Sequence, residues 1–180
     1  MDRRAGTRAD VIPISDAPSA PGVGSATATR PASVPRPSRP AGHGRVGVVL
    51  VSHSHELALA VRKLALTMTG SEDPSPVAAA GGSQSDGLGT SAVLVAAAAR
   101  RVDQGHGVAV LSDMGSAVST VLALLADADE HGLPFPVRFA DAPFVEGAVA
   151  AVVTATAGGD LAAVLDAAEE TYRQHKIGRQ

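Results

Sequence analysis

The stretch VGVVLV at residues 46–51, followed at once by SHSH at residues 52–55, decides the fold of this chain. A continuous apolar run rich in β-branched residues is typical of a strand that is buried on both faces, as in a parallel sheet. In open α/β sheets, ligands bind just beyond the carboxyl ends of the strands. The sequence therefore places His53 where a nucleophile or a general base is expected.

A second apolar run, Val108–Leu111, ends in a similar polar turn, SDMGS at residues 112–116. Apolar residues recur at helical spacing after both runs, so a helix is expected to follow each strand. The carboxyl ends of neighbouring parallel strands lie at the same edge of a sheet. We therefore predict that His53 and Asp113 meet there and that the two following helices begin at the same pocket.

The remaining elements continue this alternation. Further strands are predicted over residues 77–80 and 136–140, and helices over residues 54–69, 91–103, 116–126, 141–157 and 160–175. Strands that alternate with helices imply a parallel sheet with right-handed crossovers. The predicted fold is α/β, with a doubly wound, mostly parallel four-stranded sheet in the order 2-1-3-4 and helices on both faces.

Residues 1–44 differ in composition from the rest of the chain. Seven of the twelve prolines fall before Gly42, and the segment has no apolar periodicity. It cannot bury enough apolar surface to offset the entropy lost on ordering. We predict a disordered extension over residues 1–44 and one folded domain over residues 45–180. The extension contains six arginines and three aspartates, a composition that fits a solvated tail better than a nucleic-acid arm.

Composition narrows the possible functions of the folded part. The whole chain has a net charge of −3 and no cysteine. The acidic balance argues against a nucleic-acid surface, and the absence of cysteine excludes disulfides, thiolate catalysis and zinc–thiolate sites. His53 and His55 are two residues apart rather than four, so no metal site is expected. No apolar run is long enough to span a membrane or to form a signal peptide. We expect a cytoplasmic protein that binds neither nucleic acid nor membranes.

A histidine at a strand end suits phosphoryl transfer. Neutral imidazole is a nucleophile toward phosphorus at cellular pH. It needs an orienting group on one ring nitrogen so that the other presents its lone pair, and Asp113 is the candidate. Main-chain amides at helix N-termini can bind the phosphoryl oxygens without a metal. The residues predicted to supply those amides are Ser54, His55, Met114, Gly115 and Ser116. Each feature alone also has a structural interpretation, since residues 113–116 could simply cap a helix.

Four segments of the chain resemble a known family. They are VLVSHS at residues 49–54, GTS at 89–91, SDMGSA at 112–117 and DAPFVEGA at 141–148. Together they are similar to the phosphotransferase subunit (DhaM) family of phosphoenolpyruvate-dependent dihydroxyacetone kinases. That family is related to the mannose-type IIA domains of the bacterial sugar phosphotransferase system. The resemblance covers the chain from residue 45 onward, and the segment at 141–148 is its most specific part.

The resemblance implies a phosphohistidine relay with His53 as nucleophile and Asp113 as its supporting aspartate. It also implies that Thr90, Gly115 and Ser116 lie in loops that face the phosphoryl group. The implied donor is phosphorylated HPr, and the implied acceptor is ADP bound in the DhaL subunit, which then phosphorylates dihydroxyacetone on DhaK. On this basis the chain is a component of phosphoenolpyruvate–glycerone phosphotransferase, a homodimer that holds no cofactor itself because the ADP or ATP resides in DhaL.

Three other interpretations remain open from the sequence. A IIA component of mannose-type sugar uptake would pass the phosphoryl group to a IIB partner, although the segment at 141–148 favours the dihydroxyacetone branch. A receiver domain would use Asp113 as phosphoacceptor, but it needs an acidic pair after the first strand, where this chain has Ser52 and His53. A regulatory domain without catalytic activity would keep the histidine but not pass the phosphoryl group on.

Overall fold

The computed structural model describes residues 44–82 and 87–174. Residues 1–43, which make up nearly all of the predicted extension, lie outside the described residues, so the predicted domain boundary stays a prediction. Strands β1 (Gly47–Ser52), β2 (Val77–Gly81), β3 (Val108–Ser112) and β4 (Val137–Phe139) form one sheet. All neighbouring strands run parallel, and their order is β2-β1-β3-β4. The predicted topology is confirmed.

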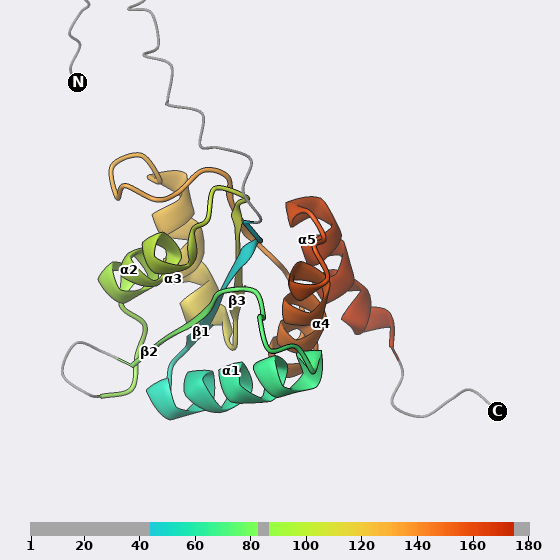
Figure 1. Ribbon diagram of the computed structural model, residues 1–180. Helices are drawn as coiled ribbons and strands as arrows, with labels where there is room; N and C mark the ends of the chain where they lie inside the picture. Colours follow the sequence, from blue (N-terminus) through green and yellow to red (C-terminus); the bar gives the residue numbers. More distant parts are fainter. Residues whose placement is uncertain (1–43, 83–86, 175–180) are drawn as a thin grey trace, which may run out of the picture. The chain divides into compact units, whose positions relative to one another are not determined.

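Helices cover both faces of this sheet (Figure 1). They are α1 (His55–Thr69), α2 (Ala92–Val102), α3 (Gly115–Ala126), α4 (Phe144–Thr156), α5 (Leu161–Glu170) and the short 3₁₀ helix η1 (Thr171–Arg173). Helices α1, α4 and α5 pack on one face, and α2 and α3 pack on the other. None of the helices within residues 44–82 and 87–174 is long and apolar enough to cross a membrane.

Strand β1 joins two apolar cores, as a strand buried on both faces must. Its side chains alternate between the faces: Val48 and Leu50 belong to the core under α1, α4 and α5. Val49 and Val51 belong to the core under α2 and α3. All six residues of β1 are buried. This double burial holds the strand rigidly, and with it the polar turn that follows.

Most predicted boundaries are off by one residue, and three differences have a local cause. The fourth strand begins at Val137 rather than at residue 136, because Pro136 has no N–H to donate to the ladder, although its carbonyl accepts from the Val108 N–H at 2.9 Å. Helix α4 begins at Phe144 rather than at residue 141, because Pro143 disfavours helical backbone at the residue before it. The last helix does not continue to residue 175. It tightens to a 3₁₀ turn after Glu170, where Thr171 Oγ1 donates to the carbonyl of Ala168 at 2.6 Å.

A glycine in α4 is required by close packing. A Cβ atom added at Gly147 would lie 2.6 Å from Ala142 Cβ and 3.2 Å from Leu111 Cδ2. We expect Gly147→Ala to lower the free energy of unfolding by about 1–3 kcal/mol, even though alanine favours helix by about 1 kcal/mol. Urea unfolding measures the change. Gly115→Ala in α3 is the matched control, since a Cβ there meets nothing within 4 Å. Equal effects in the two variants would contradict the packing argument.

Candidate functional site

The site lies where β1 and β3 end side by side. Val51 of β1 is in register with Ser112 of β3, and the Asp113 N–H donates to the Val51 carbonyl at 3.2 Å. The two turns that follow these strands therefore lie at the same edge of the sheet. The structure brings together His53 and Asp113, which are 60 residues apart in the sequence.

Three hydrogen bonds hold the carboxylate of Asp113. Its Oδ2 atom accepts from Ser52 Oγ at 2.8 Å and from the main-chain N–H of His53 at 3.0 Å. Its Oδ1 atom lies 3.2 Å from His53 Nδ1. An ionised carboxylate only accepts, so the Nδ1 atom carries the proton in this contact. The Nε2 atom of His53 consequently keeps its lone pair.

Ser116, in the first turn of α3, faces the other side of the imidazole ring. Its Oγ atom lies 2.7 Å from His53 Nε2. Because Nε2 accepts in this tautomer, the hydroxyl group donates to it. Both ring nitrogens of His53 therefore have a partner, and the ring has a defined orientation. The side chain of His53 is 21% exposed and that of Asp113 is 8% exposed. A group arriving from solvent therefore reaches the histidine and not the aspartate.

The environment stabilises the charged form of Asp113. Burial by itself raises the pKa of this carboxyl, but hydrogen bonds from Ser52, from the His53 amide and from the His53 ring outweigh it. The net result is a pKa below the ordinary value of 3.8. A carboxyl group with a lowered pKa remains ionised throughout the neutral range.

This shift makes the contribution of Asp113 to stability depend on pH. The folded-state pKa is depressed, so the stabilisation is present above the unfolded-state value of about 3.8 and is lost as pH falls through the folded-state value. We expect Asp113→Asn to be less stable than wild type at pH 7 and to approach wild type as the pH falls below about 3.8. Thermal unfolding of both proteins from pH 7 to pH 3 tests this. A gap that widens on acidification would contradict it.

The predicted amide donors differ in their availability. Ser54 is the N-cap of α1: its Oγ accepts from the Leu57 N–H, and its own N–H donates to Ser52 Oγ at 3.1 Å. The Ser54 amide is thus already used. Met114 is the N-cap of α3, and Gly115 and Ser116 begin the helix. The first N–H groups of a helix have no carbonyl partner within it, and the space in front of Gly115 is open. The structure therefore offers the start of α3 for an anion.

The segment around Thr90 also reaches this edge of the sheet. The Gly89 N–H donates to the His53 carbonyl at 3.0 Å, and Thr90 pairs with Gly82 in an isolated parallel bridge. Within the described part of the chain, two buried side-chain oxygens have no hydrogen-bond partner: Thr90 Oγ1 and Ser112 Oγ. A buried hydroxyl group without a partner is unusual. Both lie on segments that adjoin the turn carrying His53.

Ser52 is a site residue to which the sequence analysis gave no role. Its hydroxyl group donates to Asp113 and accepts from the Ser54 amide, so it joins the two turns. It is fully buried. The signal was present in the sequence: a serine that ends a strand buried on both faces needs a hydrogen-bond partner. Among the residues that the structure describes, no group of three histidine, aspartate or glutamate side chains is placed to hold a metal ion.

Comparison with known proteins assigns most of this chain to a family. The family model described as "PTS system fructose IIA component" (EIIA-man) matches residues 47–165. A solved structure titled as the unknown function protein EF1359 is 25% identical, with a TM-score of 0.59, over 76% of this chain and 99% of that chain. A sigma-54 interaction domain protein from Enterococcus faecalis shares the fold at 19% identity and a TM-score of 0.52, over 73% of this chain and 93% of its own.

No curated protein matches the sequence. The family match, however, covers β1 to β4 and all the predicted site residues. This chain therefore belongs to the EIIA-man family of phosphotransferase-system IIA components.

Proposed function

We propose that this protein is a phosphohistidine relay in which His53 Nε2 accepts a phosphoryl group and passes it to a partner protein. A IIA component exchanges phosphoryl groups with other proteins of its system, and the proposal concerns which atom does so. The observation that carries it is the contact between His53 Nδ1 and Asp113 Oδ1. That contact holds the proton on Nδ1 and leaves the lone pair on Nε2.

The reaction balances without a metal or a bound cofactor. The Nε2 lone pair attacks phosphorus, a P–N bond forms at His53, and the bond from phosphorus to the nitrogen of a donor phosphohistidine breaks. The His53 ring then carries a positive charge with its proton still on Nδ1, and the Asp113 carboxylate beside it offsets that charge. Phosphoryl transfer needs mainly positioning and charge stabilisation from the protein. The second transfer reverses these steps toward the acceptor.

Ser116 is proposed to exchange one partner for another during the reaction. Its hydroxyl group occupies Nε2 in the resting site, so it must turn away when the P–N bond forms and can then donate to a phosphoryl oxygen. The free amides at the start of α3 and the Thr90 hydroxyl group are the other proposed donors. These donors would bind the negatively charged phosphoryl oxygens that the reaction brings to the site.

We expect Ser116→Ala to slow phosphoryl uptake by about 10- to 100-fold, since one donor to the phosphoryl oxygens is lost. Single-turnover measurement of phosphorylated protein against time gives the rate. Ser119→Ala is the matched control on the same helix, because Ser119 Oγ donates only to the Gly115 carbonyl. Uptake by Ser116→Ala at the wild-type rate would remove Ser116 from the site.

For the partners, we propose the dihydroxyacetone branch of the family. Phosphorylated HPr is then the donor, and the acceptor is ADP in the DhaL subunit, which works with DhaK on dihydroxyacetone. The segment at residues 141–148 supports this choice over sugar uptake. In this proposal the protein is a cytoplasmic homodimer. The second candidate is a IIA component of sugar uptake, favoured by the match to a family of fructose IIA components.

Intact-mass measurement separates these candidates. The full chain is incubated with phosphoenolpyruvate, enzyme I and HPr, with and without ADP-loaded DhaL. One added phosphoryl group that disappears when DhaL is present supports the dihydroxyacetone relay. A group that persists with DhaL but leaves with a IIB protein supports sugar uptake. If no phosphoryl group is added under either condition, the relay proposal is wrong.

A further inference from the structure

Strand β2 is an edge strand with main-chain groups turned away from the sheet. The Val48 N–H donates to the Pro76 carbonyl at 2.9 Å, so Pro76, Ala78 and Ala80 face β1 in the parallel ladder. Val77 and Ala79 consequently turn their N–H and C=O groups to the free edge. The Arg62 side chain confirms this direction, because its Nε atom donates to the Val77 carbonyl at 2.7 Å. An unpaired edge of this kind can accept a further strand.

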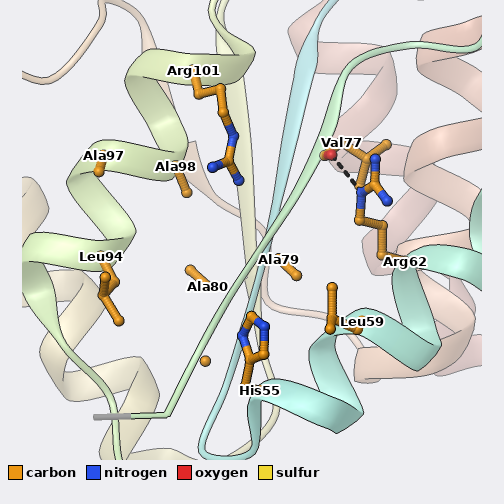
Figure 2. A pocket seen from close by; sticks show the side chains of 11 residues that line it. His55, Leu59, Arg62, Val77, Ala79, Ala80, Leu94, Ala97, Ala98 and Arg101 are labelled. Atoms are coloured by element: carbon orange, nitrogen blue, oxygen red, sulfur yellow. Dashed lines mark hydrogen bonds between the residues drawn. The ribbon is translucent and has the colours of Figure 1, made fainter. Parts of the chain in front are cut away.

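A pocket of about 400 Å³ lies along this edge, between α1 and α2. Figure 2 shows β2 crossing it, with Leu94, Ala97, Ala98 and Arg101 of α2 on one side and His55, Leu59 and Arg62 of α1 on the other. The strand contributes Val77, Ala79, Ala80 and Gly81. Because the last three carry a methyl group or no side chain, a second main chain can approach this part of the strand closely. Ala79 is half-buried, whereas the other four residues of β2 are buried.

The pocket is positively charged although the chain as a whole is not. Arg62, Arg101 and His55 line it, and no carboxylate is among its lining residues. The Nε atom of Arg62 is bound to β2, which leaves its terminal nitrogens for a ligand. Within the described residues, no hydrogen bond or ion pair is found for the side chain of Arg101. Two guanidinium groups above an open strand edge match carboxylate side chains of an extended peptide.

We propose that this pocket binds an acidic, extended segment of a partner protein, which adds to the sheet beside β2. Main-chain hydrogen bonds to Ala79 would give affinity, and carboxylates that meet Arg62 and Arg101 would give specificity. The pocket ends at His55, two residues from His53, and Gly81 packs against the main chain of Ser54 and His55. A segment bound there lies next to the candidate site. That the partner is a phosphotransfer protein rests on the function proposed above, whereas the binding itself does not.

The test uses the full chain and an end-blocked peptide of alternating glutamate and valine. Binding is measured by calorimetry, and its location by the amide NMR shifts of the ¹⁵N-labelled protein. The largest shifts are expected along β2 at Ala79, and affinity should fall with added salt. Arg62→Glu/Arg101→Glu should weaken binding about tenfold or more. Lys63→Glu/Arg100→Glu is the matched control: it makes the same change in charge one residue away on each helix and should keep the affinity.

A second variant tests strand addition separately from charge. The Ala79 N–H does not serve the ladder to β1, so Ala79→Pro costs the sheet no hydrogen bond while it removes the donor at the edge. We expect this variant to bind the peptide at least about tenfold more weakly, which corresponds to the loss of one or two hydrogen bonds. Its circular dichroism spectrum should match that of wild type. Wild-type affinity in Ala79→Pro, or the same shifts produced by inorganic phosphate alone, would overturn strand addition.

These experiments also distinguish the docking proposal from the relay proposal. Peptide binding at β2 in a protein that never takes up phosphate would support the docking surface and defeat the proposed function. Phosphorylation of His53 in a protein that does not bind the peptide would support the proposed function and defeat the docking surface.

Discussion

Replacement of His53 by alanine is expected to abolish phosphoryl uptake. The reacting lone pair belongs to Nε2 of this side chain, and the neighbouring hydroxyl groups of Ser52 and Ser116 are not activated to replace it. Ser52 is fully buried and already donates to Asp113. No phosphorylated species should therefore be detected by intact mass after incubation with phosphoenolpyruvate, enzyme I and HPr.

The control for this prediction is His131→Ala, which removes an exposed histidine from the loop between α3 and β4. That loop lies at the amino ends of the strands, away from the site, so uptake should equal that of wild type. Thermal unfolding shows whether both variants are folded. An acid-labile phosphoryl group on His53→Ala at the wild-type level would assign the chemistry to another residue and defeat the relay at His53.

Asp113→Asn is expected to slow uptake by about 10³- to 10⁴-fold while the fold persists. The asparagine oxygen can occupy the position of Oδ2 and still accept from Ser52 Oγ and the His53 N–H. The amide NH₂ then faces His53 Nδ1, which must accept rather than donate. The ring proton moves to Nε2, and the lone pair that attacks phosphorus is lost. The carboxylate charge that offsets the phosphorylated ring is lost as well.

Rapid-quench measurement of a single turnover gives the rate for this variant. Its ¹⁵N spectrum reports the tautomer directly, because a proton on Nε2 changes the chemical shifts of both ring nitrogens. Slow transfer together with the Nε2–H tautomer supports the orienting role. Transfer at the wild-type rate, or slow transfer in the original tautomer, would contradict it. Since Asp113 also bonds Ser52, circular dichroism must show that the turn has not unfolded.

The proposed docking surface and the proposed relay are adjacent in the structure. Helix α1 connects them, because Arg62 lies two turns into it and His53 and Ser54 lie just before its first residue. A partner held along β2 would therefore have one end near His55, two residues along the chain from His53. Such an arrangement raises the local concentration of a phosphoryl donor or acceptor at the reacting atom.

Most of the fold could be predicted from apolar patterns, because those patterns report burial. The run at residues 46–51 is apolar throughout, which only a strand between two layers of helices requires. Gly70 in left-handed conformation ends α1, and Asp160 caps α5; glycine and aspartate are typical of these two positions. The errors fell at Pro136, Pro143 and Thr171, where a missing N–H or a side-chain hydrogen bond competes with regular structure.

The site was predictable only in part. The types of these residues and their positions at the ends of two strands were enough to predict that His53 and Asp113 meet. They were not enough to show that Ser52 holds both turns, that the Ser54 amide is already bonded, or that the Ser116 hydroxyl group reaches Nε2. The contacts of Ser52 with Asp113 and of Ser116 with His53 join segments 61 and 63 residues apart at 2.8 and 2.7 Å, and a shift of a few tenths of an ångström would change them. Such distances follow from the register of β1 against β3 and from the position of α3 on the sheet.

By itself the sequence determined the parallel α/β fold and the edge of the sheet at which the site lies, because apolar periodicity along the chain indicates the strands, the helices and the points where the strands end. Only the tertiary structure decided which ring nitrogen of His53 keeps its lone pair and which edge of β2 is open between two arginines. Those features arise from side chains that meet across the fold. No local pattern encodes them, because their geometry depends on how separate elements pack.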